Sequence, residues 1–137
     1  MDALYQKQIL AFAQQSRASL YDESAALTAR RMNPVCGDRV DLSLNMTAGK
    51  VTAVGTRVRG CALCEAGAGL AITCLHNCTP QQIMDMTHGF TAWITKQSDT
   101  VPVDDMEKFM PVRDIRNRHK CVLLAFDAAL AALTEGG

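Results

Sequence analysis

The chain has 137 residues, of which 48% are apolar and only 5% are aromatic. This length fits one domain over residues 1–137, with a core built mainly from aliphatic side chains and methionine. Fourteen basic residues balance fourteen acidic ones, so no overall field attracts nucleic acid, and no apolar run approaches the roughly 18 residues of a membrane span. The N-terminus lacks the pattern of a signal peptide, so we expect a cytoplasmic protein.

The first half of the chain predicts one helix followed by a sheet. Residues 3–16 carry apolar side chains at a spacing compatible with an amphipathic helix, and the polar stretch "SLYDESAALTARRMNP" comes next. Residues 39–46 alternate strictly between polar and apolar, which indicates a strand. After the turn "TAGK", the segment "VTAVGTRV" is rich in Val and Thr and predicts a second, antiparallel strand.

The second half is predicted to be helical. Small and apolar residues recur at helical spacing after Gly60, which places Cys61 at or near the start of a helix. The segment "TPQQI" has the pattern of a capping box at the start of another helix, and a last helix follows Cys121. The expected fold is therefore α+β: an N-terminal helix, a small antiparallel sheet of about three strands, and C-terminal helices that cover one face of it.

Three of the six cysteines lie at predicted boundaries between elements, and such boundaries can converge in space. These are Cys36, Cys61 and Cys121. In a reducing compartment, six cysteines are more typical of metal, sulfur or redox chemistry than of a disulfide framework. With the carboxylate of Asp38, three thiolates form a sensible shell for zinc, and thiolates also suit iron-sulfur clusters. Gly37 permits the backbone angles that could aim Cys36 and Asp38 at one ion.

Three segments resemble, in the same order, the cysteine motifs of the NifU N-terminal, IscU and SufU family of iron-sulfur cluster assembly proteins. They are "NPVCGDRVDLSLNM", "VRGCALCEAGAGL" and "RHKCVLLAFDAAL", and "ALYQKQIL" is similar to the N-terminal helix of that family. The resemblance implies that the metal or cluster ligands are Cys36, Asp38, Cys61 and Cys121. It also implies that a cysteine desulfurase donates persulfide sulfur, to Cys121 in the scaffold branch or to Cys36 in the SufU branch.

The two branches imply different roles. Scaffold members assemble a [2Fe-2S] cluster for iron-sulfur apoproteins, whereas SufU-type members hold zinc and relay sulfur. The long interval between Cys61 and Cys121, together with Lys120 before Cys121, favours the SufU-like branch. The protein is then a sulfur carrier, similar to a sulfurtransferase, or a non-enzymatic scaffold.

Other residues have alternative interpretations. Cys64 could be an alternative metal ligand, or could form a dithiol with Cys61 in a thiol redox protein, although packing is the simpler role. Cys74 and Cys78 are expected to be mainly structural. His119 is expected to be a solvated residue at a helix entry rather than a ligand. The arginines, His119 and Lys120 before Cys121 could lower the pKa of that thiol or dock a partner.

Overall fold

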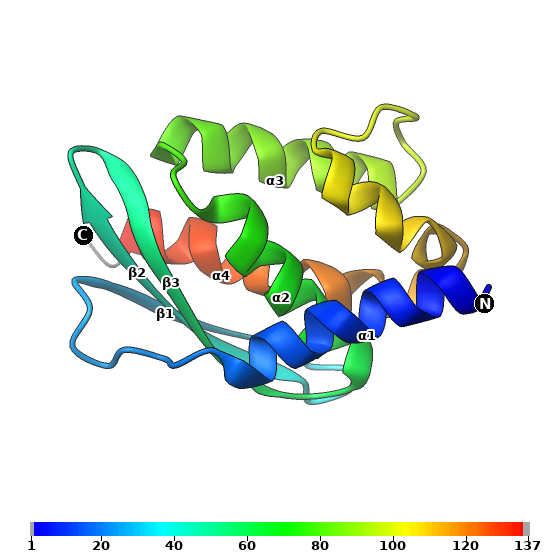
Figure 1. Ribbon diagram of the computed structural model, residues 1–137, viewed down its shortest axis with the longest axis horizontal. Helices are drawn as coiled ribbons and strands as arrows, with labels where there is room; N and C mark the ends of the chain where they lie inside the picture. Colours follow the sequence, from blue (N-terminus) through cyan, green and yellow to red (C-terminus); the bar gives the residue numbers. More distant parts are fainter. Residues whose placement is uncertain (1, 136–137) are drawn as a thin grey trace.

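The computed structural model describes residues 2–135, which form a sheet covered by helices (Figure 1). The elements in chain order are α1 (Ala3–Ala18), β1 (Leu27–Met32), β2 (Arg39–Thr47), β3 (Lys50–Arg59), α2 (Ala62–Leu75), α3 (Pro80–Ile94), the 3₁₀ helices η1 (Asp104–Asp114) and η2 (Arg116–Arg118), and α4 (His119–Glu135). This order confirms the predicted α+β fold. None of the helices described is both long enough and apolar enough to cross a membrane.

The sheet has three antiparallel strands in the order β1-β2-β3. The predicted β2–β3 hairpin is confirmed, and its turn places Ala48 and Gly49 at φ +54° and +79°, as a two-residue turn of the mirror-image type requires. Strand β1 lies in the stretch where the sequence indicated no strand. It is an edge strand without a fully buried residue, so it carries only a weak alternating pattern.

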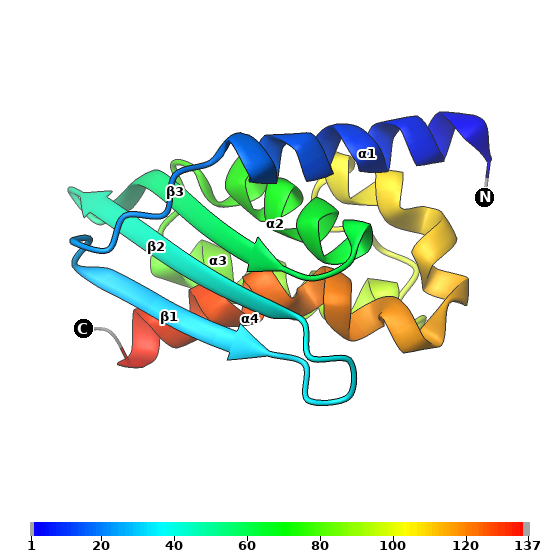
Figure 2. The same cartoon turned by 90° about the horizontal axis from the view of Figure 1, so that it is seen from below.

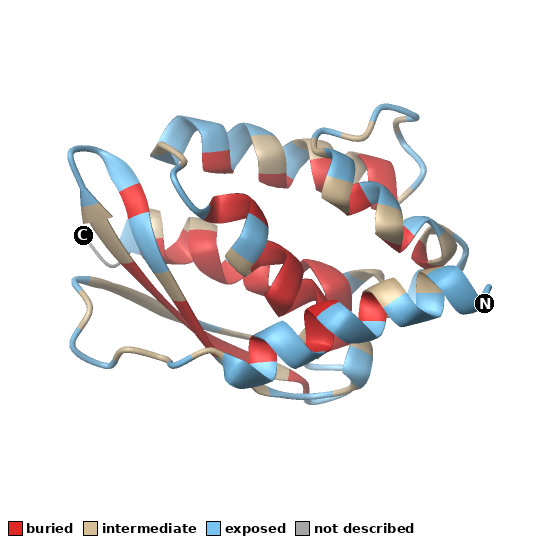
Figure 3. Ribbon diagram, in the orientation of Figure 1, coloured by how far each residue is buried: buried red, intermediate tan, exposed pale blue. Residues whose placement is uncertain are grey.

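The helices cover one face of the sheet, and the other face carries polar side chains. Val40, Leu42 and Leu44 of β2 are fully buried, and α4 packs against β1 and β2 (Figure 2). Helix α2 lies between α1 and α4, while α3 packs on α4 away from the sheet. Most of α2 and α4 is buried (Figure 3). The core therefore fills the space between the sheet and these two helices, and it extends to the buried side chains of α3 and η1.

Residues 104–118 adopt a helical form that the sequence did not predict. Met106, Phe109 and Val112 are buried in η1, and this spacing of three matches a 3₁₀ helix, in which residues i and i+3 share a face. Arg113 ties the end of η1 to α3, because its Nε donates to the carbonyl oxygen of Trp93 at 2.8 Å. This segment brings the chain back to the start of α4, where Cys121 lies.

Candidate metal centre

A tight turn between β1 and β2 presents Cys36 and Asp38. The Asn33 amide donates to the Asp38 carbonyl at 2.8 Å, and the Gly37 amide donates to the Asn33 carbonyl at 2.7 Å. The Asn33 side chain accepts from the Val35 amide at 3.1 Å. Gly37 has φ +79°, so the predicted use of its conformational freedom is confirmed. The turn leaves the Cys36 thiol exposed and buries the Asp38 carboxyl.

Two helix starts bring the other cysteines to the same place. Cys61 is the N-cap residue of α2, and Cys121 lies in the first turn of α4. Ligand atoms of Cys36, Asp38 and Cys121 all lie within 4.8 Å of one another. The Cys61 thiol is directed at Asp38 Oδ2, 3.5 Å away. Three of the four residues selected from the sequence therefore converge, and Cys61 lies beside Asp38 but outside the group of three.

The donor set and its spacing fit a tetrahedral metal ion. Zinc bonds of about 2.3 Å to sulfur and about 2.0 to 2.2 Å to oxygen place neighbouring ligand atoms about 3.5 to 3.8 Å apart. The Cys61–Asp38 separation of 3.5 Å already has this value. The ligand atoms of Cys36, Asp38 and Cys121 lie within 4.8 Å of one another, so they would move about 1 Å closer on binding an ion, and Cys61 would have to join this group. Thiolates with one carboxylate suit zinc and also suit iron in a cluster.

The surroundings of Cys121 favour a protonated thiol as long as no metal ion takes the place of the proton. Its side chain is 1% exposed, and burial, a hydrogen bond with Asp38 and negative charge at Cys61 raise its pKa to about 12. A hydrogen bond with Cys121 and negative charge at Cys61 and Cys121 raise the pKa of Arg118, so this guanidinium favours thiolates at the site. Asn33 Nδ2 lies 3.9 Å from Cys121 Sγ. Metal binding at this site must therefore displace a proton, and it should strengthen as the pH rises.

Solved structures share this fold over nearly the whole chain. A NifU-like N-terminal protein from Brucella abortus matches with a TM-score of 0.84 and 27% identity, over 94% of this chain and 91% of that one. The chain has the NifU-like N-terminal fold. The family resemblance predicted from the three cysteine motifs is thereby confirmed.

Two further structures share the NifU-like fold. A protein from the thermophilic Fervidobacterium islandicum AW-1, described as an iron-sulfur cluster assembly scaffold for the SUF system, has a TM-score of 0.80 and 21% identity, over 93% of this chain and 95% of that one. A hypothetical protein has a TM-score of 0.81 and 18% identity, over 98% of this chain and all of its own, 100%. No family model matches the sequence, and a comparison with curated proteins finds no match. The preference for the SufU-like branch stays a prediction.

The remaining cysteines of this NifU-like fold, Cys64, Cys74 and Cys78, are buried or partly buried and lie outside the candidate metal centre. Cys64 is fully buried, and burial raises its pKa, with further contributions from negative charge at Asp38 and Cys61. The structure does not bring it into the group formed by Cys36, Asp38 and Cys121. At the other end of α2, burial raises the pKa of Cys74 to about 12. The Cys78 thiol donates to the Cys74 carbonyl at 3.2 Å. A structural role for these two cysteines stays a prediction.

The cations before Cys121 have separate roles, which the sequence did not distinguish. His119 is not the solvated residue that we expected, because its Nε2 lies 2.9 Å from the Val112 carbonyl and 3.1 Å from that of Arg113. It attaches the end of η1 to α4. Arg118 instead reaches the sulfurs. The sequence could have singled out Arg118 by its position three residues before Cys121, because residues one helical turn apart are neighbours on a helix surface.

Gly60 keeps space for the Asp38 carboxyl. A Cβ at this position would lie 2.8 Å from Asp38 Cγ, closer than side-chain contacts allow. We expect Gly60→Ala to displace that carboxyl and to weaken metal binding about tenfold to a hundredfold, as loss of a ligand's support typically does. Competition with a chromophoric chelator measures the change. Gly55 of β3 is not a useful control because backbone atoms crowd it. Ala53→Gly, also in β3, serves instead. An equal loss of metal affinity in Ala53→Gly would contradict the explanation that Gly60→Ala displaces the Asp38 carboxyl.

Proposed function

We propose that this protein serves iron-sulfur cluster biogenesis in the cytoplasm by accepting persulfide sulfur from a cysteine desulfurase. The proposed site is a zinc-binding group of three cysteines and one aspartate, namely Cys36, Asp38, Cys61 and Cys121. The observation that carries the proposal is the convergence of Cys36, Asp38 and Cys121 within 4.8 Å, with Cys61 at 3.5 Å from Asp38. The description of the Fervidobacterium protein as an iron-sulfur cluster assembly scaffold supports the same area of function.

The exposure of the four residues favours Cys36 as the first sulfur acceptor. Its thiol is exposed, whereas Cys121 is 1% exposed and Cys61 is partly covered. The Cys36 thiolate would attack the outer sulfur of the desulfurase persulfide, the S–S bond would break, and the desulfurase thiolate would leave. No net oxidation occurs, because one persulfide is exchanged for another.

The other residues of the site have supporting roles in this proposal. Zinc, when bound, keeps its cysteine ligands as thiolates at neutral pH. Without the ion, the Cys61 thiol donates a hydrogen bond to Asp38, which keeps the two groups together. Arg118 places a positive charge beside Cys121, which favours negative charge on that sulfur. The chain acts as a carrier or scaffold for a partner enzyme.

Assembly of a [2Fe-2S] cluster on the same four residues, for transfer to iron-sulfur apoproteins, is the second candidate. The same donor set supports it, because three thiolates and a carboxylate can also hold iron. A redox role for a Cys61–Cys64 pair has less support, because Cys64 is fully buried and burial raises the pKa of its thiol.

One experiment separates these functions. Protein purified without chelators is analysed for zinc and iron, then incubated with a cysteine desulfurase and cysteine, and its persulfide content is measured by mass spectrometry. We expect bound zinc and a persulfide on this chain. A coloured cluster after anaerobic reconstitution with iron and sulfide, without persulfide transfer, would favour the scaffold. Absence of both metals, with desulfurase stimulation unchanged in Cys36→Ala and Cys121→Ala, would refute the metal-site proposal.

A further inference from the structure

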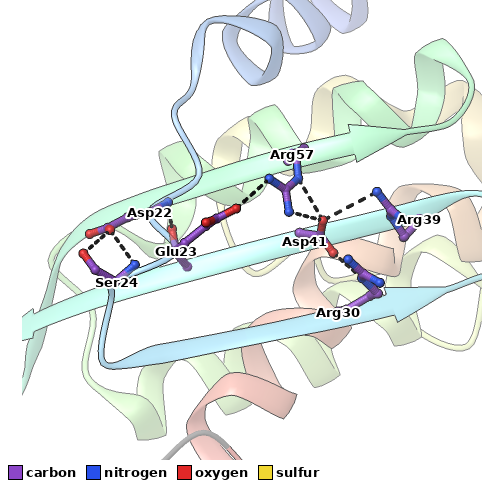
Figure 4. Close-up of polar contacts among 8 residues, drawn as sticks. Asp22, Glu23, Ser24, Arg30, Arg39, Asp41 and Arg57 are labelled. Carbon is purple, nitrogen blue, oxygen red and sulfur yellow. Dashed lines mark hydrogen bonds and ion pairs between the residues drawn. The ribbon is translucent and has the colours of Figure 1, made fainter.

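The outer face of the sheet, away from the helices, carries a cluster of arginines around one carboxylate. Arg30, Asp41 and Arg57 lie side by side in the register of the three strands. Asp41 is buried, and it accepts from Arg30 Nε at 2.6 Å and from Arg57 Nε at 3.0 Å (Figure 4). Burial alone would raise the pKa of Asp41, but these hydrogen bonds and the positive charges lower it. This carboxylate therefore stays ionised and fixes two of the arginines.

The cations on this face outnumber the carboxylates that neutralise them. Arg39 and Arg59 form the next cross-strand pair on the same face. The Arg39 side chain is only 22% exposed, yet its one ion pair within residues 2–135 is the contact with Asp41 at 3.8 Å. Its Nε is buried and has no hydrogen-bond partner among those residues. The covered Nε is out of reach of an external acceptor, but the terminal N–H groups of Arg39, with one long ion pair at 3.8 Å, have donors left for one.

This surface continues to the exposed thiol. Arg39 directly follows Asp38, and Arg59 is two residues before Cys61. Two exposed apolar residues are close to Cys36 in the chain: Met32, 56% exposed, ends β1, and Val35, 89% exposed, directly precedes Cys36. We call Arg30, Arg39, Arg57 and Arg59 the arginine face. Its Arg39–Arg59 pair lies at the end of β2 and β3 nearest in sequence to Asp38 and Cys61.

The chain itself covers the other half of the outer face. The segment from Ser19 to Ser24 crosses it, since the Asp22 amide donates to Ser43 Oγ at 3.0 Å and the Arg57 guanidinium lies 4.6 Å from the centre of the Tyr21 ring. The crossing segment also places Glu23 against Arg57 at 3.4 Å (Figure 4). An acidic segment thus already binds one end of the arginine face, while the end near Cys36 stays open.

We propose that the arginine face docks an acidic, carboxylate-bearing segment of a protein partner and so positions that partner over Cys36. Carboxylates match the planar guanidinium donors, and the neighbouring Met32 and Val35 offer an apolar anchor. A protein partner fits better than nucleic acid, because the exposed Met32 and Val35 offer apolar surface that a phosphate backbone has no apolar group to cover. The identity of this partner as a desulfurase rests on the proposed function.

The direct test uses a hexaglutamate peptide as a probe of the isotope-labelled protein. We expect amide shift changes at residues 30–32, 39–41 and 57–59, which disappear in Arg59→Glu. Arg59 makes no ion pair within the described residues, so this variant should fold, and its metal content and melting curve verify that it does. Lys50→Glu is the matched control, since Lys50 lies at the opposite end of β3 and carries the same charge change. Amide shift changes at other residues, or shift changes that persist in Arg59→Glu, would overturn the proposed docking surface. So would tighter binding of a single-stranded oligonucleotide to the same residues.

A second measurement separates this inference from the proposed function. The affinity for a cysteine desulfurase is measured for the full chain and both variants at two salt concentrations. We expect Arg59→Glu to weaken binding about tenfold at low salt, and Lys50→Glu to leave it unchanged. If the wild type accepts sulfur and both variants bind equally well, the docking inference is wrong and the proposed function stands. If the wild type accepts no sulfur, the proposed function is wrong, and the peptide titration alone decides the docking surface.

Discussion

Cys36→Ser is expected to abolish persulfide formation on this protein when a cysteine desulfurase and cysteine are supplied. The reason is access: Cys36 is exposed, whereas Cys121 is almost fully covered and burial raises its pKa to about 12. An incoming persulfide can therefore reach only the first of these two sulfurs without movement of the chain. Mass spectrometry of tryptic peptides, after alkylation that preserves persulfides, locates the added sulfur.

Two other variants provide the controls for this result. Cys121→Ser keeps the exposed thiol, so it should still acquire a persulfide at Cys36 while its metal affinity falls. Cys78→Ser removes a partly exposed thiol at the far end of α2, where Cys78 bonds to the Cys74 carbonyl, and should behave as the wild type does. A persulfide found on Cys121 with Cys36 unmodified would contradict the access explanation and would favour the scaffold branch.

Strong local patterns predicted much of this fold. The alternation of β2, the turn before β3 and the capping box of α3 each express a local physical preference, and the structure contains all three. Strand β1 could not be found in the same way, because its residues are only partly buried or exposed and carry a weak alternating pattern, although its partner β2 is the next strand in the chain. The 3₁₀ segment 104–118 depends on packing of Met106, Phe109 and Val112 into a core formed elsewhere.

The candidate site was predictable in its ligand residues but not in its surroundings. Motif and chemistry selected Cys36, Asp38, Cys61 and Cys121. The side chains of Cys36, Asp38 and Cys121 lie close together, and Cys61 contacts Asp38, while their role as metal ligands stays a prediction. Arg118 and His119 looked alike in the sequence as members of one charge run. Only the path of η2 into α4 decides that Arg118 reaches the sulfurs while His119 bonds to backbone carbonyls. Such choices depend on tertiary geometry, which a single sequence expresses weakly.

Gly69→Ala is expected to lower the free energy of unfolding by about 3 kcal/mol, the upper part of the usual range for overpacking. Helix α2 packs so closely on α1 that a Cβ at Gly69 would overlap the Phe12 carbonyl oxygen, well under 3.0 Å away. This neighbour is backbone and cannot rotate away, so α1 must shift as a unit. The gain in helix propensity from Gly to Ala, about 1 kcal/mol, offsets only part of the cost.

Gly89→Ala is the matched control for this loss, because Gly89 lies in the middle of α3 and gains the same helix propensity. Its added Cβ would meet the Pro102 ring, which belongs to the segment between α3 and η1. That segment can move at lower cost than a packed helix, so we expect a net change within about 1 kcal/mol. Urea unfolding at equal metal content compares the variants. If both glycine variants lose equal stability, close backbone contact between α1 and α2 is not the cause. If only Gly69→Ala loses stability, the contact with α1 requires a residue without a side chain at this position of α2. Cys61 is the N-cap residue of this same helix.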